Sequence, residues 1–195
     1  MAIRRVCVFC GSSPGHDPRF VESARAVGRI LAENGMELVY GGGRVGLMGA
    51  VAEAALAAGG RVIGIIPEAL ARREVAFQGL TELVVVGSMH ERKQKMADRS
   101  DAFVALPGGF GTFEEFCEIV TWSQLGMHAK PCVLVDVHHY YQPMVAMIDR
   151  AHEAGFVRTE HRDIVSTIAS PDELIAALRD YRAPVLEPWL TGAQT

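Results

Sequence analysis

Nine residues, 107–115, join a run of glycines to a carboxylate, a pairing suited to chemistry on a phosphorylated substrate. They read PGGFGTFEE and stand between an apolar run and a segment with helical periodicity, so we expect them at a strand-to-helix turn. Glycines there let main-chain N–H groups approach an anion closely, and the helix start adds positive potential. Thr112 can cap the helix or bond a phosphate oxygen. Glu115, one turn further on the same face, can point at whatever the phosphate carries.

A second glycine-rich turn, YGGGRVGLMG, covers residues 40–49 and opens another expected helix. Its glycines at 41, 43 and 46 have the spacing of a dinucleotide-binding loop, and Glu68 follows about 20 residues on, so a dehydrogenase has to be considered. The spacing alone is weak evidence, and it falls on the second strand-helix unit; the turn after the first strand reads CGSSPG. We favour a loop on which the base or sugar of a nucleotide lies flat. The substrate-binding candidates from these two turns are Ser12, Gly42, Gly43 and Met48.

Arg92 and Lys93 are the cations that such a site needs. A phosphate dianion and the Glu115 carboxylate cannot share a pocket without positive charge, and this pair follows the fourth expected strand, at the edge where the other motifs meet. Without that context, an Arg-Lys pair would indicate only a solvated helix start. Glu74 is a weaker candidate, since by itself it is a surface glutamate in a charged loop.

The elements that must position these residues alternate between strand and helix along the whole chain. This pattern predicts an α/β fold: a Rossmann-like, doubly wound, mainly parallel sheet of about seven strands with helices on both faces and ligands at the carboxyl ends of the strands. The expected strands are 5–10, 37–40, 61–66, 82–86, 102–106, 132–135 and 164–167. The expected helices are 18–34, 47–58, 90–100, 112–125, 142–154 and 171–181.

Length and composition are those of one soluble domain, here 1–195 with a C-terminal tail at 183–195. The chain has 195 residues, 49% hydrophobic and 22% charged, with a net charge of −4. Basic residues are scattered, which argues against nucleic acid as a partner, and no apolar run is long enough to span a membrane. Since no signal peptide is visible, we expect the cytoplasm. A stretch at 67–79 could be a flap over the site.

Cysteine and histidine spacing does not indicate a metal site. Cys7 and Cys10 have CxxC spacing, but residues three apart in a strand point to opposite faces, so we expect buried apolar roles. The pair His138 and His139 is expected in a solvated loop. We therefore predict neither a metal nor another cofactor.

These motifs together resemble the LOG family, the cytokinin riboside 5′-monophosphate phosphoribohydrolases, often labelled lysine decarboxylases. The resemblance extends over nearly the whole chain and includes the PGGxGTxxE signature at 107–115. It implies hydrolysis of the N-glycosidic bond of N6-modified or plain adenosine 5′-monophosphates, releasing free base and ribose 5-phosphate, by a homodimer. It also implies that Arg92 and Glu115 are catalytic. The substrate site that it implies includes Glu74, Arg92, Lys93, Gly108, Gly109, Phe110, Gly111, Thr112, Glu115 and Thr121.

The implied chemistry agrees with the residue types. Cleavage at the anomeric carbon passes through an oxocarbenium-like state, which the Glu115 carboxylate can stabilise. Arg92 stays charged, so it suits positioning better than proton donation. Two alternatives are a broader nucleoside 5′-monophosphate nucleosidase and a non-catalytic carrier like those of the molybdenum cofactor. Amino-acid decarboxylation is least favoured, since no lysine has the context of a pyridoxal-phosphate Schiff base.

Overall fold

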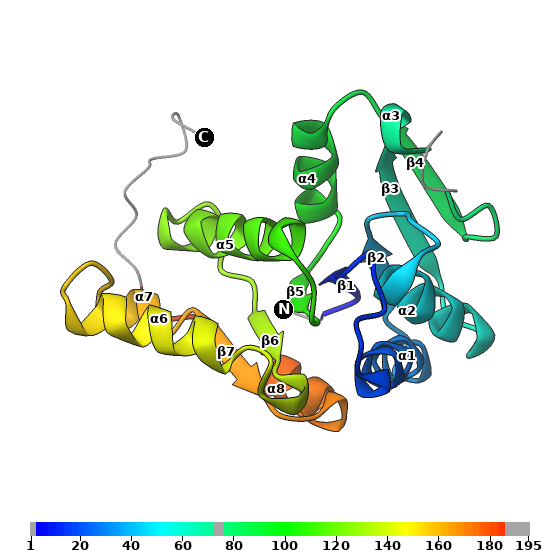
Figure 1. The fold of residues 1–195 in the computed structure, drawn as a ribbon. Coiled ribbons are helices and arrows are strands. Elements are labelled where there is room, and N and C mark those ends of the chain that lie inside the picture. The colour runs from blue at the N-terminus through cyan, green and yellow to red at the C-terminus, as the bar shows by residue number, and fades with distance from the viewer. Residues whose placement is uncertain (1–2, 72–75, 186–195) are drawn as a thin grey trace.

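The computed structural model describes residues 3–71 and 76–185, and it confirms the alternation of strands and helices (Figure 1). The strands are β1 (Arg5–Phe9), β2 (Glu37–Tyr40), β3 (Val62–Pro67), β4 (Glu82–Val86), β5 (Ala102–Ala105), β6 (Cys132–Val135) and β7 (Val165–Ile168). The α-helices are α1 (Pro18–Glu33), α2 (Gly46–Ala57), α3 (Glu68–Ala71), α4 (Met89–Asp98), α5 (Phe110–Gln124), α6 (Gln142–Glu153), α7 (Thr159–Arg162) and α8 (Leu174–Asp180). Two 3₁₀ helices are η1 (Val137–His139) and η2 (Pro171–Glu173).

All seven strands run parallel in the order β4-β3-β2-β1-β5-β6-β7, as a doubly wound sheet requires. Val6 in β1 is in register with Leu38 of β2 on one side and with Ala102 of β5 on the other. The chain winds outward from β1 to the edge at β4, returns through α4, and continues from β5 to β7. The point where the strand order reverses therefore lies between β1 and β5, and ligands of open α/β sheets bind at such a point.

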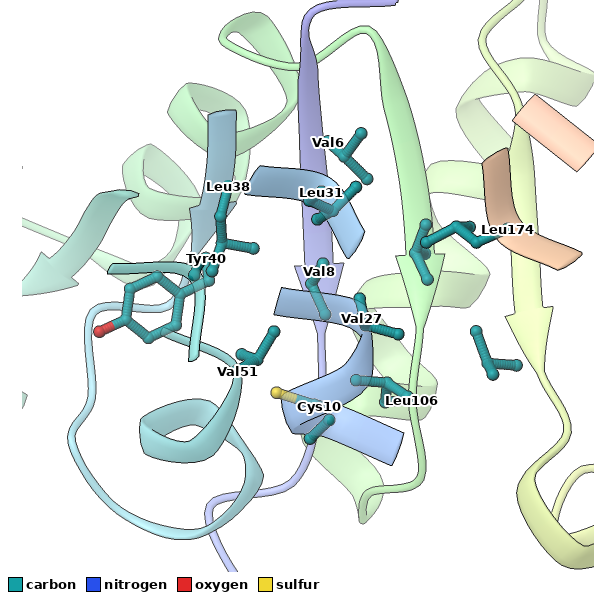
Figure 2. Close-up of a cluster of buried hydrophobic side chains, with 14 of the residues drawn as sticks. Val6, Val8, Cys10, Val27, Leu31, Leu38, Tyr40, Val51, Leu106 and Leu174 are labelled. Atoms are coloured by element: carbon teal, nitrogen blue, oxygen red, sulfur yellow. The ribbon is translucent and has the colours of Figure 1, made fainter. Parts of the chain in front are cut away.

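Each face of the sheet is covered by its own hydrophobic layer, because successive side chains of a strand point to opposite faces. Val6, Val8 and Cys10 pack toward α1, α2 and α8, together with Leu31 and Leu174 (Figure 2). The alternate residues of β1, including Cys7, pack toward α4 and α5. Cys7 and Cys10 thus lie in different layers, which confirms the prediction that they cannot share a ligand.

Helix boundaries follow local capping chemistry. The Asp17 carboxylate accepts from the Arg19 main-chain N–H (2.9 Å) with Pro18 at the first helical position, so α1 begins where predicted. The predicted last helix instead opens as the 3₁₀ turn η2, whose Ser170 and Glu173 form a capping box, and becomes α-helical at Leu174. α5 begins at Phe110, two residues earlier than predicted, because Gly109 serves as its N-cap.

Some predictions concern residues that the structure does not describe. The core of the expected flap, at 72–75, and most of the tail, at 186–195, lie outside the described residues. His138 and His139 are exposed, as expected; they fall within η1, but their φ values of 52° and 61° are not those of a regular 3₁₀ helix. Among the described residues, no helix combines the length and apolar character needed to cross a membrane.

Candidate active site

The loops after β1 and β5 are joined directly at the switch point. The Gly11 main-chain N–H donates to the Pro107 carbonyl (3.0 Å). A Cβ atom at Gly108 would lie 2.1 Å from the Thr112 hydroxyl and 2.9 Å from the Gly11 nitrogen, so only glycine fits at position 108. This close approach holds the glycine-rich loop and the start of α5 in one rigid unit.

The amino end of α5 presents main-chain donors beside that loop. Along α5, the first main-chain N–H that donates a hydrogen bond to another main-chain group is that of Phe113, which donates to the Gly109 carbonyl (3.1 Å). The N–H groups of Phe110, Gly111 and Thr112 precede it and have no acceptor within the helix. Together with the positive end of the helix dipole, they form a cradle for an anion such as phosphate. The Thr112 side chain is buried, whereas Phe110 is 92% exposed.

A buried ion pair lies one turn further along α5. The Arg92 Nη1 atom is 3.1 Å from the Glu115 Oε1 atom, and the two side chains are only 11% and 9% exposed. Arg92 comes from α4, and its position is fixed by β3, since its Nε donates to the Ile65 carbonyl (3.2 Å). Gly41 leaves room for the guanidinium, because a Cβ atom there would lie 2.1 Å from Nη2. The structure therefore brings the two predicted catalytic residues together.

Burial raises the pKa of the Glu115 carboxyl, and the neighbouring Arg92 guanidinium opposes the rise. The net pKa shift is upward, so the carboxyl holds a proton to higher pH than an exposed glutamate does. A perturbed carboxyl paired with a fixed cation beside an anion cradle is typical of a reaction centre.

The Lys93 ammonium group is paired with carboxylates and is therefore not free to bind phosphate alone. Its ammonium group pairs with the carboxylates of Glu114 and Glu118 on α5, the second at 3.0 Å, and its side chain is 12% exposed. Burial lowers the pKa of Lys93, but hydrogen bonds to Glu114 and Glu118 outweigh this effect, so the net shift of the pKa is upward. In this arrangement Lys93 links α4 to α5. Its contact with a substrate stays a prediction.

The glycine-rich turn after β2 packs against the same centre. Gly42 has a φ of 77°, and its carbonyl accepts from the Phe77 N–H (3.1 Å), while Gly43 forms a bridge with Ala76. The Gly11 carbonyl accepts from the N–H groups of Leu47 (3.0 Å) and Met48 (3.4 Å), the first turn of α2. These donors are thus occupied, and α2 does not offer them to a pyrophosphate as a dinucleotide-binding loop does.

The other predicted site residues are placed in different ways. Ser12 is exposed and lies against Gly46, where a Cβ atom would be 2.3 Å from the Ser12 carbonyl carbon. Thr121 is exposed on α5, donates to the Cys117 carbonyl (2.8 Å), and lies about 9 Å beyond Glu115 along the helix axis. Within one chain, the structure does not bring Thr121 to the ion pair. Glu74 lies outside the described residues.

Sequence reasoning missed the residues that support the site. Gly41 and the Ile65 carbonyl shape the Arg92 position: Gly41 was noticed only as part of a dinucleotide-binding spacing, and nothing in the sequence marks the Ile65 carbonyl. Tyr140 donates to the Gly108 carbonyl, and Tyr141 donates to the Leu106 carbonyl (2.7 Å). One signal was available: both tyrosines follow β6 at the carboxyl edge of the sheet, where ligand sites gather.

A parallel sheet with a glycine-rich loop and a buried Arg–Glu pair at its switch point places this protein in the class of Rossmann-like α/β proteins. The family described as "Possible lysine decarboxylase" matches residues 48–178, which is more than half of the chain. The chain belongs to this family, the LOG family, as its motifs suggested.

Named relatives match over most of the chain. A cytokinin riboside 5′-monophosphate phosphoribohydrolase from Rhodococcoides fascians is 49% identical over 177 residues, covering 90% of this chain and 89% of the relative. A probable enzyme of the same name, LOGL2 from Oryza sativa subsp. japonica, is 48% identical, covering 91% and 73%. Among solved structures, the molybdenum cofactor carrier protein of Chlamydomonas reinhardtii superimposes with a TM-score of 0.69 at 23% identity, covering 91% of this chain and 96% of the carrier. That likeness concerns the fold alone.

The space at Gly41 can be tested by Gly41→Ala. The added methyl group would displace the Arg92 guanidinium or strain the loop, so we expect a loss of about 1–3 kcal/mol in the free energy of unfolding, measured by urea denaturation. Gly87→Ala is the matched control, because its Cβ atom would come no closer than 3.5 Å to Glu91 Oε2. Equal stability of the two variants would show that Gly41 does not constrain Arg92.

Proposed function

We propose that this protein hydrolyses the N-glycosidic bond of adenosine 5′-monophosphate and its N6-modified forms, releasing free base and ribose 5-phosphate. The observation that carries the proposal is the buried Arg92–Glu115 pair one turn beyond the α5 anion cradle. A 5′-phosphate bound at the cradle directs the ribose toward the carboxylate. Relatives that are 48–49% identical are named as phosphoribohydrolases of cytokinin riboside 5′-monophosphates, which supports this reaction.

The roles of the two side chains follow from charge. As the bond between C1′ and the base nitrogen breaks, positive charge develops on the sugar, and the Glu115 carboxylate stabilises it in a site largely shielded from water. The oxygen of a water molecule ends on C1′, and the base leaves with a proton. Arg92 keeps Glu115 oriented and opposes the pKa rise caused by burial, so that the carboxylate form is populated.

The alternatives have weaker support. A molybdenum cofactor carrier is favoured by the fold alone, at 23% identity. A broader nucleoside 5′-monophosphate nucleosidase uses the same residues. Comparing turnover of AMP, GMP, CMP and N6-isopentenyl-AMP separates it from the proposed reaction, because a preference for CMP contradicts an adenine-type pocket.

The catalytic role of Glu115 is tested by Glu115→Gln. The amide keeps the shape but cannot stabilise the developing cation, so we expect kcat to fall on the order of 100- to 10,000-fold while AMP still binds. Arg92→Ala should weaken binding as well as turnover. Glu91→Gln is the control, since that carboxylate accepts from the Gly87 N–H and pairs with Lys95 instead. Wild-type turnover in Glu115→Gln would remove the carboxylate from the mechanism.

The pKa of Glu115 also predicts a pH dependence. Protonation removes the reactive form, so kcat should fall on the acid side with a midpoint above the ordinary glutamate value of 4.5. Arg92→Gln removes the cation that lowers this pKa and should move the midpoint of the residual activity to higher pH. Arg99→Gln, whose guanidinium pairs with Glu82, should leave it unchanged. A midpoint at or below 4.5 in the wild type would contradict the assignment.

We also propose that the protein forms a homodimer. Each chain is a single domain, and the protein acts in the cytoplasm. No residue of α6 is fully buried: Met144 and Val145 pack partly against the core, whereas Met147 lies on the exposed face of the helix. The Met147 side chain is 68% exposed, and Phe156 just beyond the helix is 86% exposed. A second copy of the chain would cover this face. The free cysteines Cys7, Cys10, Cys117 and Cys132 suit a reducing compartment.

The α6 face is tested by sedimentation of Met147→Glu. A buried charge at a dimer contact is costly, so we expect the wild type to sediment as a dimer and the variant as a monomer at micromolar concentration. Val85→Glu is the control, because Val85 is 53% exposed on the edge strand β4 at the opposite side of the sheet. A monomeric wild type, or a Met147→Glu variant that remains dimeric, would contradict this interface.

A further inference from the structure

Three successive carbonyl groups of the loop after β5 are occupied by donors from the scaffold. The Leu106 carbonyl accepts from the Tyr141 hydroxyl (2.7 Å), and the Pro107 carbonyl accepts from the Gly11 N–H (3.0 Å). The Gly108 carbonyl accepts from the Tyr140 hydroxyl. Two of these three donors are side chains, and both come from the connection between β6 and α6.

These hydrogen bonds keep the carbonyl oxygens of the loop on the scaffold, away from the N–H groups at the start of α5. A carbonyl oxygen repels a phosphate, whereas a main-chain N–H attracts it. With the carbonyls of Leu106, Pro107 and Gly108 bonded to the scaffold, the peptide planes are fixed. The N–H groups at the start of α5 then remain for an anion. A rotation of the Gly108 peptide would bring its oxygen toward the cradle.

The connection that carries the two tyrosines is itself under strain. His138 and His139 have φ values of 52° and 61°, a left-handed conformation that costs free energy for residues other than glycine. The Asp136 carboxylate accepts from the Tyr141 N–H (2.6 Å) and anchors the turn. Such strain persists only where the surrounding structure imposes it, and here it turns two consecutive phenol groups back toward the loop.

Packing fixes the Tyr140 ring independently of its hydroxyl group. The ring lies against Phe20 (centroids 5.6 Å apart) and Phe113 (6.4 Å), and Tyr141 contacts it edge to face (5.1 Å). Tyr141 is itself buried. Loss of the Tyr140 hydroxyl alone would therefore free the Gly108 carbonyl without moving the ring.

We propose that Tyr140 and Tyr141 are positioning residues for the phosphate end of the substrate, acting through the carbonyls of Gly108 and Leu106. The inference rests on the proposed function for the identity of the substrate. The positioning role itself requires only that the loop after β5 binds a phosphate group. It assigns a role to a tyrosine pair on β6–α6 that touches neither the reacting bond nor the Arg92–Glu115 pair.

The test is Tyr140→Phe, with inorganic phosphate and ribose 5-phosphate as calorimetric probes. Removing one hydrogen bond from the loop should raise the dissociation constants of both about three- to tenfold, with a similar rise in KM for AMP and little change in kcat. Tyr141→Phe should show the same affinity loss and also lower the melting temperature, because it leaves a buried carbonyl without a donor.

Tyr181→Phe is the matched control. Its hydroxyl has no hydrogen-bond partner in the part of the chain that the structure describes, so the same chemical change there should leave phosphate affinity unaltered. Phosphate affinity in Tyr140→Phe equal to that of the wild type would overturn the inference, as would a wild type that does not bind phosphate. The proposed function is tested separately, by measuring release of free base from AMP. Tyr140-dependent phosphate binding without any base release would support the positioning role and reject the hydrolase.

Discussion

The buried ion pair between Arg92 and Glu115 is the constraint on which the rest of the site depends. A carboxylate with 9% of its side chain exposed would take up a proton rather than stay charged, unless a cation lay within a few ångströms. Arg92 supplies that cation at 3.1 Å, and the Ile65 carbonyl and the space at Gly41 fix where it sits. Glu115 is thus shielded from water and paired with a fixed cation, as the proposed role requires.

The topology of the sheet explains why this pair can form. α4 carries Arg92 on the return from the edge strand β4 to β5, and α5 carries Glu115 immediately after β5. Both helices pack on the same face of the sheet, and the Arg92–Glu115 pair joins them. Lys93, paired with Glu114 and Glu118, links the two helices beside the Arg92–Glu115 pair. The loops after β1 and β5 close the site from the other side.

Local patterns predicted the seven strands, the position of the glycine-rich loop, and the convergence of Arg92 with Glu115. The alternation of strands and helices predicts a parallel sheet, and in a parallel sheet the carboxyl ends of the strands lie at one edge. The partners of Lys93 could not be predicted, because they depend on the spacing between α4 and α5. The hydrogen bonds from the first turn of α2 to the Gly11 carbonyl could not be predicted either, because main-chain contacts do not depend on residue type. The positions of Tyr140 and Tyr141 depend on a left-handed turn at two histidines, a conformation that few residues other than glycine adopt.

In the proposed reaction, a 5′-phosphate held at α5 directs bond cleavage next to Glu115. This reaction is tested most directly by chromatography of the products from AMP and from adenosine under identical conditions. We predict adenine and ribose 5-phosphate in equal amounts from AMP. With adenosine we expect a rate lower on the order of 100-fold or more, because binding energy from the phosphate is used at C1′. Adenosine cleaved as fast as AMP, or no adenine released from AMP, would contradict the proposed reaction.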